Sequence, residues 1–177
     1  MPLRSQNLAG AWKDWLSTEG GKLLLYARSR TNCQQDAEDL MQEALIRLWG
    51  YQEERGHVPP DVPLAYSVLR LCGMDYGRKQ GRRTKKQKKI IQFHDYDEHW
   101  LDRGVEEDEE AEFLRCAVEK LTDKLREVIT MKIWGGLTFA QIAEVLKISQ
   151  NTAASRYRYA LEQLQKSLGR LKEARNG

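Results

Sequence analysis

The sequence has few of the features that mark secreted or membrane-spanning proteins. Its 177 residues include only three cysteines, and no apolar run approaches the roughly 18 residues that a membrane span needs. The N-terminus lacks the apolar core of a signal peptide. We therefore expect a cytoplasmic protein that does not insert into a membrane.

The three cysteines argue against cysteine-based scaffolds. Cys33, Cys72 and Cys116 are odd in number and far apart, and no C-x-x-C pair occurs. A disulfide framework or a zinc site normally shows paired cysteines at characteristic spacings. Because each cysteine lies in a stretch with apolar periodicity, we expect reduced thiols that face the core.

Sequence motifs of catalysis are also missing. The chain has no Ser-His-Asp set, no P-loop and no dinucleotide-binding motif, and its three histidines are scattered. We therefore expect no enzymatic activity, no cofactor and no metal site.

Strand patterns are scarce, whereas helix-forming residues are abundant. Runs of alternating Val, Ile and Thr are missing, and the chain has only four prolines. Leu, Ala, Glu, Lys and Arg are frequent, and 41% of the residues are hydrophobic. This composition predicts an all-α fold.

Charge is distributed unevenly along the chain, although the formal net charge is only +3. The net charge is −2 over residues 1–77, +8 over 78–89, −9 over 90–112 and +6 over 113–177. Two basic regions separated by an acidic one suit a protein that contacts nucleic acid at two places.

The acidic region also indicates a domain boundary. It has few apolar residues, and repulsion among its carboxylates should keep it extended and solvated. We therefore predict two small helical domains, residues 1–92 and 112–177, joined by an acidic flexible linker over residues 93–111.

An amphipathic helix is predicted over Asp36–Trp49. Its apolar residues recur at helical spacing, so its polar residues fall on the opposite face. The apolar residues are Ala37, Leu40, Met41, Ala44, Leu45 and Leu48.

The elements on either side of this helix are marked by glycine and proline. A helical pattern over Trp12–Ala27 has Gly20–Gly21 as a weak point, so we expect one interrupted helix or two short ones. Gly and Pro residues predict a loop over Tyr51–Pro63. A further helix begins near Leu64 and becomes basic beyond Tyr76.

The C-terminal half carries a helix-turn-helix pattern. Thr138 and Gln141 are spaced as a capping box at the start of a short helix. Lys147–Ser149 then forms a tight turn, and Ser149 can cap the next helix. The inward residues of that next helix are Ala153, Tyr157, Ala160, Leu161, Leu164 and Leu168.

The second helix of a helix-turn-helix enters the major groove of DNA with polar or basic residues near its N-terminus. An ordinary amphipathic helix pair is the alternative interpretation. The outward residues here are Asn151, Ala154, Ser155, Arg158 and Tyr159, and Arg156 borders them.

Leu121–Leu168 resembles region four of bacterial-type sigma factors of the extracytoplasmic-function class, which reads the minus-thirty-five promoter element. The matching residues are Leu121, Arg126, Val128, Thr138, Gln141, Ile142, Ala143, Thr152, Ser155, Arg156 and Ala160. The resemblance implies DNA contacts by Asn151, Thr152, Ala154, Ser155, Arg156, Arg158 and Tyr159.

Two residues depart from the pattern of that region. Lys147 replaces a common Gly in the turn, where a left-handed residue would be strained by about 1–2 kcal/mol. Tyr159 replaces a frequent basic residue, which implies different contacts there.

The run Asp36–Ala44, together with Leu48–Trp49, resembles the region-two helix that such factors dock on the clamp helices of RNA polymerase. A solvated acidic helix face is the plainer interpretation, but the run D-A-E-D-L-x-Q-E is more specific than charge alone. The resemblance implies contacts with core polymerase by Asp36, Glu38, Asp39, Gln42, Glu43 and Arg47.

The next helix is similar to the one that melts and holds the minus-ten element in the same family. Aromatic rings and Arg planes can stack on unpaired bases while basic residues follow the phosphates. Core packing of Tyr66 and a merely soluble basic linker are the alternatives. The residues implied are Tyr66, Arg70, Asp75, Arg78, Arg82 and Arg83.

Together these resemblances predict a sigma factor that binds core RNA polymerase and promoter DNA. Factors of this class are often held inactive by an anti-sigma factor, which is a further expected partner. A stand-alone helix-turn-helix regulator is the main alternative, and a sigma-like decoy that opens no promoter is another.

Overall fold

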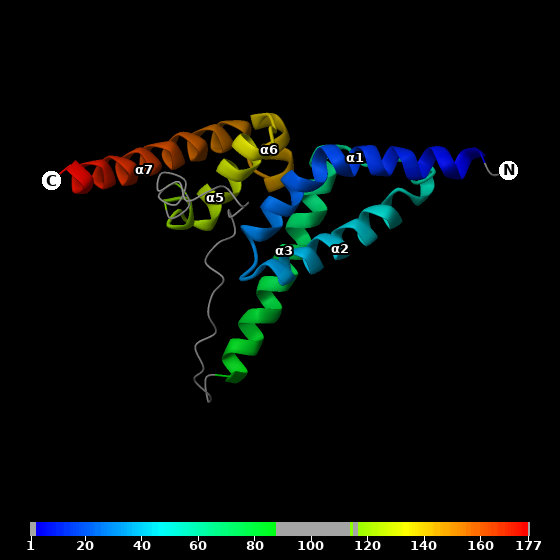
Figure 1. Ribbon diagram of the computed structural model, residues 1–177, viewed down its shortest axis with the longest axis horizontal. Coiled ribbons are helices and arrows are strands. Elements are labelled where there is room, and N and C mark those ends of the chain that lie inside the picture. The colour runs from blue at the N-terminus through cyan, green and yellow to red at the C-terminus, as the bar shows by residue number, and fades with distance from the viewer. Residues whose placement is uncertain (1–2, 88–113, 115–116, 177) are drawn as a thin grey trace. The chain divides into compact units, whose positions relative to one another are not determined.

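The computed structural model describes residues 3–87, 114 and 117–176, with side chains for residues 8–82, 114 and 117–170. Every regular element in these ranges is helical, which confirms the predicted all-α fold. The helices before residue 88 and those after residue 116 belong to two compact units (Figure 1). The predicted linker lies outside the described residues. None of the described helices has both the length and the apolar character needed to cross a lipid bilayer.

Helix α1, Leu3–Arg28, is continuous. The predicted interruption at Gly20–Gly21 is therefore wrong. Glycine costs about 1 kcal/mol relative to alanine inside a helix. Directly after it, however, Leu23, Tyr26 and Ala27 are buried where α1 packs against the other helices of its unit. The free energy gained by this packing outweighs the helix-destabilising effect of the two glycines.

Helix α2, Gln34–Tyr51, contains the predicted amphipathic segment. Cys33 occupies its N-cap, where Sγ accepts a hydrogen bond from the amide of Asp36 at 3.4 Å. The predicted apolar stripe faces inward, fully buried at four positions and half-buried at Met41 and Leu45. The four buried residues are Ala37, Leu40, Ala44 and Leu48.

The connection after α2 holds a short 3-10 turn, η1, Glu53–Arg55. Helix α3, Val62–Gln87, begins slightly earlier than predicted. The Oδ1 atom of Asp61 accepts a hydrogen bond from the amide of Leu64 at 2.9 Å, as an N-cap residue does. Pro63 lies in the first turn, where the absence of its N–H removes no helical hydrogen bond.

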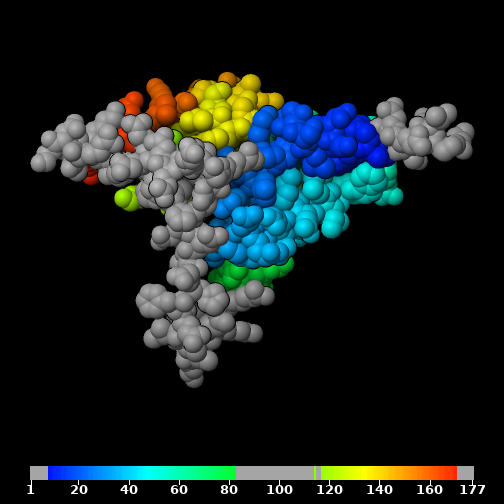
Figure 2. Space-filling model, in the orientation of Figure 1, coloured from blue at the N-terminus to red at the C-terminus, as the bar shows by residue number. Residues whose placement is uncertain are grey.

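The core of the first unit forms where α1, α2 and α3 contact one another pairwise. Figure 2 shows the surfaces of α1, in blue, and α2, in cyan, side by side. Tyr26 of α1 and Tyr66 of α3 pack edge to face with ring centroids 5.4 Å apart, and neither ring is exposed. This aromatic contact thus holds α1 against α3.

Of the two cysteines that the structure describes, only Cys72 faces the core as predicted. Cys72 is a buried free thiol on α3, and burial raises its pKa, which favours the neutral form. Cys33 is also free but only half-buried, at the N-cap of α2. Cys116 lies outside the described residues.

In the second unit, helix α5, Asp123–Ile129, runs directly into a single π-helical turn, η2, Thr130–Trp134. Helices α6, Phe139–Leu146, and α7, Gln150–Asn176, follow as the predicted helix-turn-helix. Helix α7 packs against both α5 and α6. The core side chains include Val128, Ile129, Ile142, Leu146, Ala153, Ala160 and Leu164.

The caps of the helix-turn-helix confirm the sequence prediction. The Thr138 hydroxyl accepts from the Gln141 amide at 3.2 Å, and the Gln141 side chain accepts from the Thr138 amide at 2.8 Å. The Ser149 hydroxyl accepts from the amide of Thr152 at 3.0 Å. Lys147 adopts the left-handed conformation, with φ 55° and ψ 47°.

Replacing Lys147 by glycine should stabilise the second unit. We expect Lys147→Gly to raise the free energy of unfolding by about 0.5–1 kcal/mol, because glycine adopts this conformation without steric strain. The matched control is Lys166→Gly at an exposed position inside α7, which should lower it by about 1 kcal/mol. Urea unfolding followed by circular dichroism measures both, and destabilisation by Lys147→Gly would contradict the strain at this turn.

Candidate functional site

The outward face of α2 carries most of the residues predicted to contact polymerase. Asp39 and Gln42 are exposed, and Glu43, one helical turn from Asp39, is half-buried. Glu38 is half-buried and accepts a hydrogen bond from Gln34 at 2.8 Å. Because the stripe on the opposite side is buried, these polar groups form a surface that another protein can reach.

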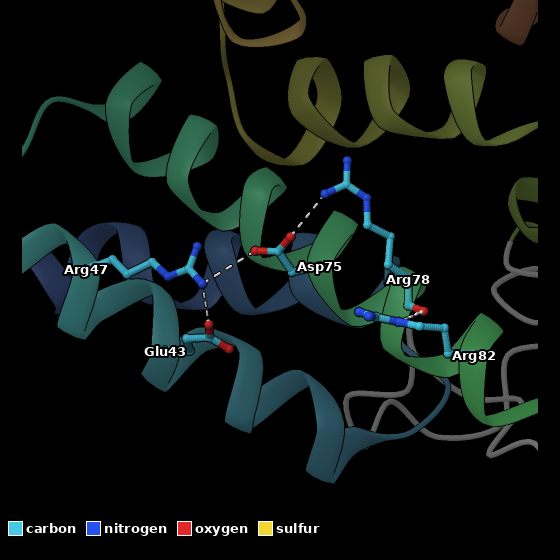
Figure 3. A network of polar contacts seen from close by, with 5 residues as sticks. All are labelled: Glu43, Arg47, Asp75, Arg78 and Arg82. Carbon is cyan, nitrogen blue, oxygen red and sulfur yellow. Dashed lines mark hydrogen bonds and ion pairs between the residues drawn. The ribbon is translucent and has the colours of Figure 1, made fainter.

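Arg47 connects this face to α3. One of its terminal nitrogens, Nη2, lies 2.6 Å from Oε1 of Glu43 on its own helix and 3.5 Å from Oδ2 of Asp75 on α3. The other oxygen of Asp75, Oδ1, lies 3.3 Å from Nη1 of Arg78. Figure 3 shows Asp75 between the two guanidinium groups. Two predicted sites, one for polymerase and one for DNA, therefore share a polar network.

A second polar link joins the N-terminal end of α2 to α3. The Tyr76 hydroxyl donates a hydrogen bond to Oδ2 of Asp36 at 2.6 Å. Burial and this hydrogen bond raise the pKa of Tyr76 to about 12, so its hydroxyl stays protonated at neutral pH. Asp36 is thereby held against α3, and its role is at least partly to fix the two helices together.

The outer face of α3 becomes basic toward its C-terminal end. Arg78 and Arg82 are exposed, and Nε of Arg82 donates to the main-chain oxygen of Arg78 at 3.3 Å. Arg70 is half-buried on an earlier turn. Arg83 belongs to the same helix, but its side chain lies outside the described residues, as do those of the lysines that follow.

The prediction that Tyr66 contacts DNA is corrected by its burial. Its ring has no exposed surface, and burial raises the pKa of its hydroxyl well above the ordinary value. A base cannot stack on a ring whose faces are covered by protein. Tyr66 is instead a core residue that packs on Tyr26.

The N-terminal part of α7 presents the predicted recognition surface. Asn151, Ser155, Arg158 and Tyr159 are exposed, and 61% of Tyr159 is accessible. The other three predicted residues are half-buried, and the hydroxyl of Thr152 lies 2.8 Å from that of Ser149 in the cap. These three are Thr152, Ala154 and Arg156.

Sequence reasoning did not single out Ile46, which is the most exposed large apolar residue described, at 73%. It lies three residues after Glu43, so the helical period places it on the outward face of α2. That spacing was visible in the sequence. The cross-helix role of Tyr76 had no comparable signal, because it depends on how α2 and α3 pack.

Two family models match the chain. Residues 16–83 match Sigma-70 region 2, and residues 113–164 match Sigma-70, region 4. The first match spans α2 and most of α3, and the second spans α5 and α6 with much of α7. The chain belongs to the sigma-70 family. The two matched regions are those predicted, in the predicted order, which confirms that the chain is a sigma-70 family member.

Solved structures share the fold of this sigma factor. The sigma factor RpoE from Bartonella quintana, solved with the anti-sigma factor NepR, has a TM-score of 0.68 and 20% identity, and the match covers 89% of this chain and 96% of that one. CnrH, solved with the cytosolic domain of CnrY, has a TM-score of 0.61 and 19% identity, over 94% and 95% of the two chains. A comparison with curated proteins finds no match.

Because Tyr66 is a core residue of the sigma factor, its hydroxyl should not add to stability. The oxygen is buried without a hydrogen-bond partner among the described residues, so Tyr66→Phe should leave the free energy of unfolding unchanged or raise it by about 1 kcal/mol. Tyr66→Ala should lower it by about 3–5 kcal/mol. Thermal and urea unfolding measure both changes. A clear loss of stability in Tyr66→Phe would show that the hydroxyl has a partner and would contradict this assignment.

Proposed function

We propose that this sigma factor binds core RNA polymerase through the outward face of α2, opens the minus-ten element with α3 and recognises the minus-thirty-five element with α7. The observation that carries the proposal is the presence of three polar surfaces: those of α2 and α7 lie opposite buried stripes, and that of α3 lies on the exposed part of the helix beyond its buried residues. Regions 2 and 4 match the helices concerned. Binding energy gained at these surfaces would be turned into strand separation at one class of promoter.

The polymerase-binding surface is proposed to combine polar and apolar contacts. Asp39, Gln42 and Glu43 supply charge and hydrogen-bonding groups, and Ile46 supplies an exposed apolar side chain on the same face. Protein interfaces of this kind derive specificity from charge and much of their affinity from an apolar centre. Trp49, 45% exposed at the C-terminal end of α2, extends the apolar part.

The minus-ten surface is proposed to be the basic face of α3. Arg78 and Arg82 are positioned to meet phosphates, and eight basic residues lie between residues 78 and 89 with no acidic ones. Leu71, 50% exposed, lies seven residues before Arg78 and hence on the same side of the helix. An apolar side chain beside basic groups suits contact with the faces of unpaired bases.

The minus-thirty-five surface is proposed to be the N-terminal part of α7. Asn151 and Ser155 can bond base edges or phosphates, and Arg158 can reach guanine or phosphate. Tyr159 offers an aromatic ring with a hydroxyl at a position where the family more often has a basic residue.

The proposed domain division is unchanged: a first domain over residues 1–92, an acidic linker over 93–111 and a second domain over 112–177.

An anti-sigma factor is proposed as a regulatory partner, because RpoE, which shares this fold, was solved in complex with one. A stand-alone helix-turn-helix regulator gives no account of the region 2 match over residues 16–83. The sigma factor function therefore explains more of the chain.

Charge reversal on α2 tests the proposed polymerase contact. We expect Asp39→Arg to weaken binding to core polymerase about tenfold, because it replaces an exposed carboxylate with a cation at the centre of the proposed interface. The matched control is Asp14→Arg on the exposed side of α1, which should change the affinity less than about twofold. Fluorescence anisotropy of labelled protein measures both. Equal effects of the two variants would place the interface elsewhere.

Truncation on α7 tests the proposed promoter contact. We expect Arg158→Ala to lower affinity for a duplex carrying the minus-thirty-five element about five- to tenfold, which is typical of losing one base or phosphate contact. Lys166→Ala, two turns further along the same helix, should have less than about a twofold effect. Binding is measured at fixed salt with the polymerase holoenzyme, on a promoter found by mapping transcript starts. No loss in Arg158→Ala would remove Arg158 from the proposed surface.

A further inference from the structure

The network in Figure 3 joins four charged side chains in a row, of alternating sign. Glu43 contacts Arg47 at 2.6 Å, Arg47 contacts Asp75 at 3.5 Å, and Asp75 contacts Arg78 at 3.3 Å. Asp75 uses one carboxylate oxygen for each arginine. Each inner group therefore divides its attraction between two partners of opposite charge.

This sharing makes the contacts competitive. Arg47 lies closer to Glu43 than to Asp75, so in the free chain Arg47 neutralises only part of the negative charge of Asp75. The rest of that charge attracts Arg78. If Glu43 were engaged by a cation or donor of another protein, Arg47 would lose its nearer partner and turn more fully to Asp75. Asp75 would then hold Arg78 less strongly.

We infer that Asp75 is a positioning residue in a charge relay, which restrains Arg78 in the free sigma factor and releases it toward DNA phosphate when polymerase engages Glu43. This inference rests on the proposed function, in which Glu43 contacts polymerase and Arg78 contacts DNA. It assigns Asp75, a carboxylate that would repel phosphate, a role other than direct DNA contact. In this relay, Arg47 transmits the engagement of Glu43 on α2 to Asp75 on α3.

The expected size of the effect is modest. All four side chains are partly exposed, with side-chain accessibilities between 37% and 66%, so solvent screens each pair. Exposed pairs of this kind change equilibria by about two- to fivefold. The relay would thus adjust DNA affinity and timing rather than act as an all-or-none switch.

Arginine side-chain NMR on the full chain tests the relay without DNA or polymerase. Glu43→Gln imitates engagement of Glu43 by removing its charge, and it should lower the ¹⁵Nε heteronuclear NOE of Arg78, which reports greater mobility. Asp39→Asn removes one charge from the same helix outside the network and should leave Arg78 unchanged. Asp75→Asn should mobilise Arg78 fully, and adding Glu43→Gln to it should have no further effect.

An unchanged Arg78 in Glu43→Gln, or equal changes in Glu43→Gln and Asp39→Asn, would overturn the relay. Thermal unfolding of each variant checks that the fold is retained, which is expected because every changed side chain is at least partly exposed.

Binding of a single-stranded DNA oligonucleotide to the same proteins separates this inference from the proposed function. We expect Glu43→Gln to bind it about two- to fivefold more tightly than wild type, beyond any gain in Asp39→Asn. The gain should vanish in the Asp75→Asn background. Release of Arg78 in the NMR experiment without any gain in DNA affinity would keep the coupling between Glu43 and Arg78, but it would overturn the release toward DNA and remove Arg78 from the proposed DNA surface.

Discussion

Burial of one apolar stripe on α2 is the constraint on which the first unit depends. Ala37, Leu40, Ala44 and Leu48 all face α1 and α3, and each is at most 3% exposed. Fully burying one leucine contributes about 1.5–3 kcal/mol, so rotating α2 about its axis would cost several times the energy of any surface contact. The stripe therefore fixes which polar residues point outward, and with them the surface that we propose for polymerase.

The same principle orients α7 in the second unit. Ala153, Ala160 and Leu164 are buried against α5 and α6, which leaves Asn151 and Arg158 outward. Small alanines at the contact let the helices approach closely, and the caps at Thr138 and Ser149 fix where α6 and α7 begin. In both units, the side chains proposed for function are thus those that do not pack in the core. The directions in which they point follow from the side chains that do pack there.

Hydrophobic periodicity and helix-capping residues allow most of this structure to be predicted from the sequence. The stripe on α2 and the capping box are local features, and local patterns predict them well. The left-handed conformation of Lys147 was expected only from the resemblance to region four, because lysine does not favour it. Features set by tertiary contacts were not predictable in this way. Gly20–Gly21 stays helical because the residues that follow are buried. Tyr66 is buried because its ring packs on that of Tyr26. Arg47 forms an ion pair with Asp75 on another helix. Each depends on a partner distant in sequence, which no local pattern identifies.

We propose that the three surfaces act together to start transcription at particular promoters. The most direct measurement adds this protein to sigma-free core polymerase with a pool of genomic promoter fragments and maps the transcript starts. We expect specific starts that share two upstream elements at fixed spacing. Stable binding to core without specific starts would contradict the promoter-opening role, and failure to bind core would contradict sigma factor function altogether.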